Sequence, residues 1–161
     1  PSDNFDPDET GITFEENSYI KAKEAAILSK NISLADDSGL CVEALDGAPG
    51  IHSARYAPTA EERIGKLLTN LTHASNRKAK FVCAMTLVDE NGNVLDKEIG
   101  ECYGEIAKSQ SGINGFGYDP IFVVDGYGVT MADMSEDLKN KISHRSKALE
   151  KIISYVRSEL M

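Results

Sequence analysis

The sequence predicts an α/β protein in which helices pack on one sheet. Segments with apolar residues at helical spacing alternate with short apolar segments of strand length, which is typical of this fold class. Residues 79–88 are apolar on both faces, as expected of a central strand that is covered on both sides. The chain has 161 residues, so we expect a single domain over residues 1–161.

Composition excludes several classes of partner. The formal net charge is −9, which disfavours a nucleic-acid or anionic membrane surface because such surfaces need clustered Lys and Arg. A polyphosphate ligand remains compatible, since a local basic pocket or a divalent cation can hold it. No apolar run is long enough for a membrane span, and no signal peptide is visible. The three cysteines are scattered, so we expect a reducing, cytoplasmic location.

The first regular element follows a polar stretch that we interpret as loop through Gly11. Thr13 and Glu16 have the spacing of a capping box, which predicts a helix over residues 14–29. Taken alone, Lys21 of this helix is an ordinary solvated lysine. The residues available to face the core are Ile20, Ala25, Ala26 and Leu28.

Two adjacent carboxylates follow a short apolar segment. Residues 32–35 predict a strand, and the residues after it, Asp36 to Gly39, combine two acids, a hydroxyl and a glycine. This composition is typical of an Asp-rich turn. It is equally the composition of a carboxylate site at the end of a strand, where α/β proteins bind ligands and metals. We expect a sharp corner here, followed by a strand over residues 40–45.

A Gly/Pro loop over residues 47–56 and a second helix come next. Thr59 and Glu62 repeat the capping-box spacing, which predicts a helix over residues 59–71. The strand over residues 79–88 is followed by an Asn-Gly turn at residues 89–93, which predicts a hairpin.

The second half of the chain is predicted as strands, loop and helices. Residues 94–107 alternate loosely and contain Gly100 and Gly104, so we expect a strand pair with a bend or bulge. The remaining predictions are a loop at 109–114, a buried strand at 121–124, a helical turn at 136–140 and a helix at 146–160. The last helix has an apolar stripe of Leu149, Ile152, Ile153, Val156 and Leu160.

Several polar motifs between these elements carry a resemblance to a known family. They are ETGITFEEN at residues 9–17, ADDSGL at 35–40, GAPGIHSARYA at 47–57, GFGYDPIF at 115–122 and ISHRSKAL at 142–149. Together, and in this order, they resemble the inosine triphosphate pyrophosphatase family, the pyrophosphatases of non-canonical purine nucleoside triphosphates.

The resemblance implies a house-cleaning enzyme of nucleotide metabolism. Such an ITPase hydrolyses dITP, ITP and XTP to the monophosphate and pyrophosphate with Mg²⁺ as cofactor. It also implies an elongated mixed sheet flanked by helices, two lobes with a central cleft, and a homodimer. The expected partner is the nucleoside triphosphate substrate, with no nucleic acid and no membrane.

The resemblance also implies a role for each motif residue. Asp37 is the central carboxylate, which binds Mg²⁺ or activates the attacking water, and Glu9 completes the metal site. Asp36 and Asp8 are secondary metal candidates. Among the implied substrate-binding residues, Ser38 lies beside the acids, and Lys21 and Lys139 bind the phosphates or the polar edge of the nucleotide. Phe116 stacks on the purine, Gly117 and Tyr118 shape the pocket, and Asp119 contacts the base. His144 and Arg145 recognise the ring.

Other interpretations of these residues stay open at this point. Phe116 in a Gly-Phe-Gly turn is by itself more often a core aromatic, and His144 could simply begin a helix. Lys139 and Lys141 are typical of a solvated face. The family's N-terminal strand and its Ser/Thr-x-Asn-x-x-Lys phosphate loop are missing from the sequence, so we expect an N-terminally truncated chain. The alternative function is a nucleotide-binding module without turnover.

Overall fold

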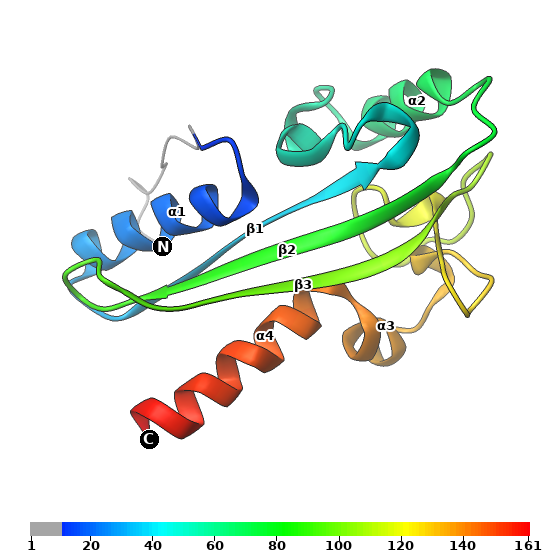
Figure 1. Cartoon of the computed structure of the whole chain (residues 1–161). Coiled ribbons are helices and arrows are strands. Elements are labelled where there is room, and N and C mark those ends of the chain that lie inside the picture. Colours follow the sequence, from blue (N-terminus) through cyan, green and yellow to red (C-terminus); the bar gives the residue numbers. More distant parts are fainter. Residues whose placement is uncertain (1–10) are drawn as a thin grey trace. The chain divides into compact units, whose positions relative to one another are not determined.

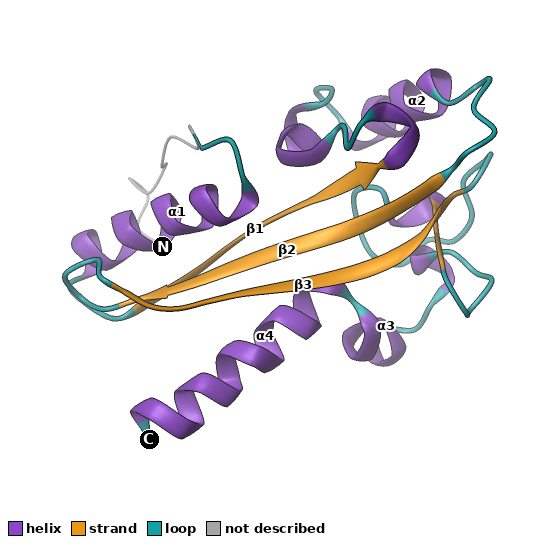
Figure 2. Cartoon of the chain, in the orientation of Figure 1, coloured by secondary structure: helices purple, strands orange, loops and turns teal. Residues whose placement is uncertain are grey.

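The computed structural model describes residues 11–161, which form the helices and strands shown in Figure 1. The described strands form one sheet in the order β1 (Ser33–Val42), β2 (Lys78–Val88), β3 (Val94–Ile106) and β4 (Phe122–Val124), shown in Figure 2. β3 and β4 pair antiparallel, with Gly104 opposite Val124. None of the helices in this part of the chain has the length and apolar character needed to cross a membrane.

The chain divides into two compact units. The first unit comprises residues up to Ser38, Val82–Gly100 and His144–Met161. The second unit comprises Gly39–Phe81 and Glu101–Ser143. Each unit has a core of its own, so each can be described by itself.

The first unit is built on β2, which is covered on both faces. On one face Ala22 and Ala26 of α1 (Phe14–Ser29) pack with Val88. On the other face Cys83, Met85 and Leu87 pack with α4 (His144–Tyr155) through Ala148 and Ile152. Successive strand residues point to opposite faces, so the prediction of a central, doubly buried strand is confirmed.

The bounds predicted for the first helix are confirmed, but its predicted core face is only partly right, because Ala26 is buried whereas Ile20, Ala25 and Leu28 are not. The Thr13 side chain accepts a hydrogen bond from the Glu16 N–H, and Lys30 ends the helix in the left-handed conformation. The buried residues are Asn17, Ser18, Ala22 and Ala26, whereas Leu28 is 55% exposed. Small side chains at positions 18, 22 and 26 allow a close approach to β2, where the Ser18 and Thr86 hydroxyls lie 2.7 Å apart.

The expected corner at Asp36 is wrong. β1 continues without a break through both acids, the serine and the glycine, and ends at Val42, where a 3₁₀ turn replaces the end of the predicted second strand. Asp and Gly are poor strand formers, but pairing with β2 and contacts to both helices outweigh this local preference.

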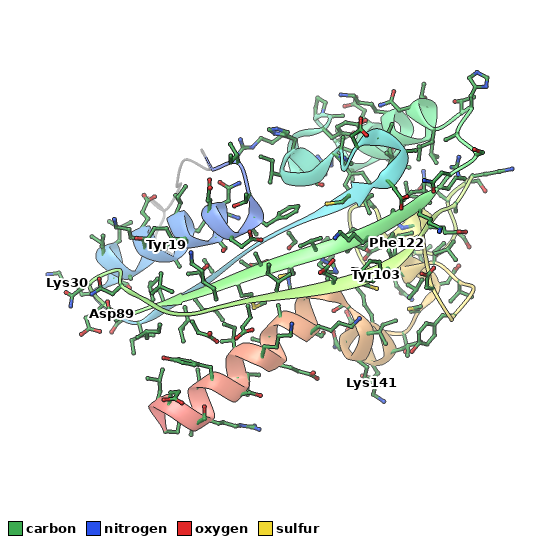
Figure 3. All side chains as sticks on the ribbon, viewed as in Figure 1. Tyr19, Lys30, Asp89, Tyr103, Phe122 and Lys141 are labelled. Carbon is green, nitrogen blue, oxygen red and sulfur yellow. The ribbon has the colours of Figure 1, made fainter. Side chains whose placement is uncertain are left out.

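The hairpin between β2 and β3 is confirmed. The Asp89 N–H donates to the Asn93 carbonyl at 2.8 Å, and Gly92 has a φ of +84°. The Asp89 carboxylate accepts two backbone N–H bonds from Asn91 and Asn93 at 2.9 Å each, which closes the turn. Figure 3 shows Asp89 at this end of the sheet.

The expected pair of strands in the next segment is wrong, because β3 is one unbroken strand of 13 residues. Its glycines have another purpose. A Cβ at Gly100 would lie 2.0 Å from the His144 carbonyl oxygen, and a Cβ at Gly104 would lie 2.2 Å from the Val123 carbonyl oxygen. Both glycines therefore permit close backbone approach of a neighbouring segment.

The second unit has the larger apolar cluster. The predicted second helix is confirmed as α2 (Ala60–Asn70) with Thr59 as its cap. Its Ile64 and Leu67 pack with residues of all four strands. Phe122, labelled in Figure 3, belongs to the same cluster. The centroids of the Phe122 and Phe81 rings are 4.4 Å apart. The predicted helical turn near residue 136 is a seven-residue helix, α3 (Glu136–Ile142).

The last helix begins earlier and buries less than predicted. α4 begins at His144, so His144 and Arg145 lie in its first turn, and a π-helical segment, Val156–Leu160, follows Tyr155. Ala148 and Ile152 are buried, but Leu149 and Ile153 remain 38% and 39% exposed.

Candidate functional site

The predicted catalytic carboxylate lies beside the predicted lysine of α1. Asp37 is only 6% exposed, and the Lys21 ammonium is 3.3 Å from its Oδ1 atom. The same ammonium donates to the Asp36 carbonyl oxygen at 3.0 Å. Because a buried carboxylate needs a compensating charge, the Lys21 ammonium stabilises and orients the Asp37 side chain.

The neighbouring acid points the other way, toward α4. The Oδ2 atom of Asp36 accepts a hydrogen bond from Arg145 Nη2 at 3.1 Å and another from Ser38 Oγ at 3.2 Å. Asp36 and Ser38 share one face of β1, whereas Asp37 is on the other. The structure thus brings Asp36, Ser38 and Arg145 together in the first unit.

Cys83 is a member of this group that reasoning from the sequence missed. Its Sγ atom lies 3.9 Å from Asp36 Oδ2 and is placed to donate its proton. Burial, and then the nearby Asp36 charge, raise the pKa of Cys83 to about 11, so the thiol stays protonated at neutral pH. The available signal was the doubly buried β2 segment, whose alternation sets Cys83 on the face that packs against α4.

A second cluster lies in the second unit, around Asp119. Lys139 Nζ is 2.6 Å from Asp119 Oδ2, and the Phe116 N–H donates to the same oxygen at 3.1 Å. The Lys139 ammonium also lies over the Phe116 ring, 4.6 Å from its centroid. Phe116 is 66% exposed and is therefore not the core aromatic of the alternative interpretation. An exposed ring beside a fixed charge pair can stack on a flat ligand.

Two glycines shape this loop. Gly115 has a φ of +77°, and a Cβ there would lie 2.2 Å from Asp119 Oδ2. Gly117 also has a positive φ, of +60°. Both conformations favour glycine, so the shape of this loop depends on its glycines as well as on its side chains.

Tyr118 has its side chain in the core and not in an open pocket. Its hydroxyl donates to the Ser53 carbonyl at 2.7 Å, and the residue is 6% exposed. Burial raises the pKa of Tyr118 to about 12, which keeps the phenol neutral. The structure therefore gives Tyr118 a supporting position, in which it ties the Phe116 loop to the segment around Ser53.

The expected metal site is only partly within the described residues. Glu9 and Asp8 lie outside residues 11–161. Among residues 11–161, no group of three or more His, Cys, Asp or Glu side chains could hold a metal ion. Asp37 supplies one hard oxygen donor, which suits Mg²⁺ chemically. Asp36 is turned toward Arg145 and does not share this face.

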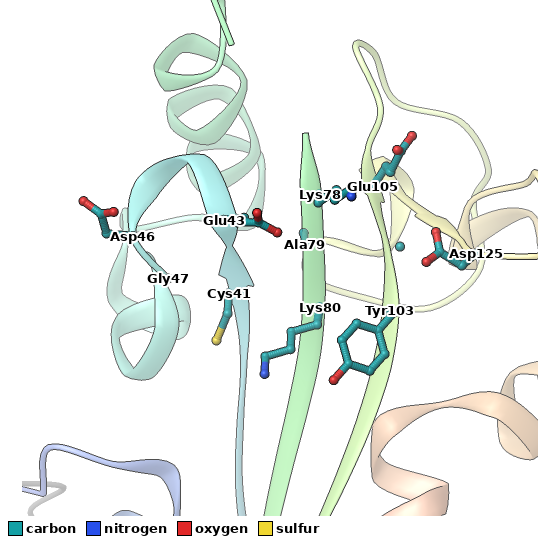
Figure 4. A pocket seen from close by; sticks show the side chains of 11 residues that line it. Cys41, Glu43, Asp46, Gly47, Lys78, Ala79, Lys80, Tyr103, Glu105 and Asp125 are labelled. Atoms are coloured by element: carbon teal, nitrogen blue, oxygen red, sulfur yellow. The ribbon is translucent and has the colours of Figure 1, made fainter. Parts of the chain in front are cut away.

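A separate hollow of about 730 Å³ opens on the sheet of the second unit (Figure 4). Its floor includes Cys41 and Lys80, with Tyr103 at the side. Lys80 forms an ion pair with Glu101 at 2.8 Å, and this bond raises the pKa of Lys80. None of the predicted site residues lines this hollow, so it is distinct from both clusters.

The motifs and the fold agree with one protein family. Residues 2–155 match the sequence model of the Ham1 family. The chain belongs to this family. It is 48% identical to a dITP/XTP pyrophosphatase of Treponema denticola over 95% of this chain and 81% of that protein. A dITP/XTP pyrophosphatase of Synechocystis is 47% identical, over 91% of this chain and 75% of that protein.

Solved structures of Ham1 proteins confirm the α/β fold class. The Staphylococcus aureus Ham1 protein superimposes with a TM-score of 0.91 at 43% identity, over 97% of this chain and 82% of that one. A HAM1 protein from Coxiella burnetii gives a TM-score of 0.91 at 44% identity, over 95% and 81% of the two chains. The sequence-based assignment to the family is therefore confirmed.

Proposed function

We propose that this chain is a nucleoside triphosphate pyrophosphatase that hydrolyses dITP, ITP and XTP to the monophosphate and pyrophosphate. The observation that carries this function is the buried Asp37 carboxylate, held 3.3 Å from Lys21, in a Ham1-family chain that is 48% and 47% identical to two proteins named dITP/XTP pyrophosphatase. We propose that residues 1–161 act as one catalytic domain that removes non-canonical nucleotides from the nucleotide pool.

The chemistry assigned to the first unit is hydrolysis of a phosphoanhydride. Water attacks the α-phosphorus, the bond to the bridging oxygen of the β-phosphate breaks, and pyrophosphate leaves. Negative charge spreads over the phosphate oxygens, so catalysis is mainly positioning and charge neutralisation. Asp37 holds a metal ion or accepts a proton from the water, and Lys21 meets the phosphates beside it.

We assign the metal site to Asp37 and Glu9, with Mg²⁺ as the cation. The donor chemistry of Asp37 fits, because a carboxylate oxygen is a ligand that Mg²⁺ prefers. A bound Mg²⁺ would neutralise phosphate charge. The Lys21 ammonium, 3.3 Å from Asp37 Oδ1, offsets the charge of this carboxylate.

The chemistry assigned to the second unit is recognition of the base. The exposed Phe116 ring stacks on the purine, while Asp119 and Lys139, joined at 2.6 Å, meet its polar edge, with Gly117 and Tyr118 supporting the loop. Ser38 is assigned to the substrate beside the acids, and His144 and Arg145 are assigned to the purine ring. A donor aimed at the 6-keto oxygen faces another donor in adenine, which gives selectivity against ATP.

The proposed dimer is carried over from the family, and the proposed location follows from the scattered cysteines. We place the enzyme in the cytoplasm, with the nucleotide pool, as a homodimer that requires neither nucleic acid nor a membrane. Light scattering of the purified protein measures its mass directly. A mass of one chain at micromolar concentration would contradict the dimer.

The test of the function is pyrophosphate release. Purified protein is incubated with dITP, XTP or ATP, with Mg²⁺ and with EDTA. We expect release from dITP and XTP at least about tenfold faster than from ATP, in Mg²⁺ only. Equal rates with the three nucleotides would contradict the proposed substrate class. Nucleotide binding by calorimetry without any release would point instead to the binding module.

A further inference from the structure

Three hydrogen-bond donors from different parts of the first unit meet at one carboxylate oxygen. Asp36 Oδ2 accepts from Arg145 Nη2 at 3.1 Å. Ser38 Oγ donates to it at 3.2 Å, and Cys83 Sγ lies at 3.9 Å. These donors come from α4, β1 and β2, so the Asp36 carboxylate is a shared anchor for three elements.

The orientation of Asp36 follows from the strand that carries it. Consecutive side chains of β1 point to opposite faces, and the Asp37 carboxylate is paired with Lys21 of α1. Lys21 also holds the Asp36 carbonyl at 3.0 Å, which fixes the peptide between the two acids. That peptide is held, and the Asp37 side chain faces α1. The Asp36 carboxylate is therefore directed toward α4.

We propose that Asp36 is a positioning residue for Arg145 and not a metal ligand. Arginine loses much rotational freedom when it is held in one geometry, and a charge-assisted bond to a carboxylate selects that geometry before substrate arrives. Arg145 is about half exposed, with 49% of its side chain accessible, and the bond to Asp36 at 3.1 Å restricts the orientation of its guanidinium. This inference rests on the proposed function, because it assigns the orientation of a residue proposed to read the base.

The surroundings of Asp36 argue against a cation at its carboxylate. The three partners of Asp36 Oδ2 named above are proton donors, and one of them carries a full positive charge. A metal ion at this oxygen would be repelled by the guanidinium and would have to displace it. The high pKa of Cys83 agrees with a proton held on that thiol, which a metal-binding thiolate would lack.

The experiment compares Asp36→Asn with Asp37→Asn in pyrophosphate release from dITP. For Asp36→Asn we expect KM to rise about tenfold, while kcat stays within about threefold of wild type. The reason is that the contact orienting Arg145 is lost, whereas Asp37 is kept. Selectivity for dITP over dATP should fall by a similar factor. In an Arg145→Ala background, Asp36→Asn should change kcat/KM by less than about twofold, since the two residues act together.

Three further variants separate positioning from damage to the fold. Asp36→Glu keeps the carboxylate and should recover at least part of the lost selectivity. Cys83→Ser keeps a donor to Asp36 and should leave KM within about twofold of wild type. Glu101→Gln removes another carboxylate that pairs with a cation, Lys80 at 2.8 Å, and serves as the matched control with unchanged kinetics. Thermal unfolding of every variant checks that it is folded.

The outcomes distinguish this inference from the proposed function. Loss of kcat in Asp36→Asn as large as in Asp37→Asn, or additive effects of Asp36→Asn and Arg145→Ala, would overturn the positioning role while wild-type activity stands. A wild type that neither binds nor hydrolyses dITP would overturn the proposed function, and this inference with it.

Discussion

Asp36 and Asp37 are adjacent in β1, yet their carboxylates pair with cations from different helices. Asp37 Oδ1 lies 3.3 Å from Lys21 of α1, and Asp36 Oδ2 lies 3.1 Å from Arg145 of α4. The alternation of side chains along a strand produces this division. Two adjacent acids in a turn could have bound the same ligand. Because these two lie on opposite faces of a strand, their carboxylates pair with different cations.

Replacing Asp37 with Asn should remove activity without unfolding the protein. We expect kcat to fall about 10²-fold or more, because the amide neither accepts a proton at neutral pH nor binds a cation strongly. The melting temperature should fall by several degrees while the protein stays folded, since the amide keeps the size of the side chain but leaves Lys21 without its charge partner at 3.3 Å. Pyrophosphate release and thermal unfolding measure the two effects. Glu150→Gln, at an exposed position of α4, is the control and should match wild type.

Gly100→Ala should disturb the start of α4. The added Cβ would lie 2.0 Å from the His144 carbonyl oxygen and 2.6 Å from the Ala148 nitrogen, so the helix backbone must move. We expect a loss of about 1–3 kcal/mol in the free energy of unfolding, measured in urea, and a raised KM through His144 and Arg145. Gly65→Ala is the matched control, because its Cβ meets nothing within 4 Å on α2, and it should stabilise by up to about 1 kcal/mol. An unchanged urea midpoint for Gly100→Ala would contradict the close contact.

Phe116→Ala and Phe122→Ala should have opposite consequences. Phe116 is 66% exposed, so its loss should leave the melting temperature nearly unchanged and weaken nucleotide binding by about 1–3 kcal/mol through lost stacking. Phe122 is fully buried against Phe81, so its loss should cost about 3–5 kcal/mol of unfolding free energy. Calorimetry with dITP and urea unfolding measure the pair. Strong destabilisation by Phe116→Ala would contradict this prediction and would indicate that the ring packs in the core.

The stability of the protein should fall at alkaline pH in a way that depends on Cys83. Its pKa is raised from 9.0 to about 11 in the folded protein, mainly by burial, so the folded state holds the proton more tightly than the unfolded state. The resulting stabilisation is complete below pH 9 and is lost as the pH rises from about 9 to 11. In Cys83→Ser, the decline in unfolding free energy over this interval should be smaller. The same decline in both proteins would contradict a raised thiol pKa.

Local sequence signals identified most of the elements. Thr13 and Thr59 each accept a hydrogen bond from a glutamate N–H three residues later, as their spacing predicts, and the Asn-Gly turn forms the predicted hairpin. These signals act over three or four residues, so the sequence alone is sufficient to read them. Faces of helices were harder to predict, because Ser18 and Ala22 are buried for their small size and not for their hydrophobicity.

The ordered motifs were sufficient to nominate the site candidates, because they are those of the family to which the chain belongs. The three-dimensional fold grouped these residues. It extended β1 through Asp36 and Asp37 and so gave each acid a different cation, and it placed Cys83 beside Asp36. The physical reason is that strand pairing and burial outweigh the turn preference of Asp, Ser and Gly, and these forces come from segments far away in the chain.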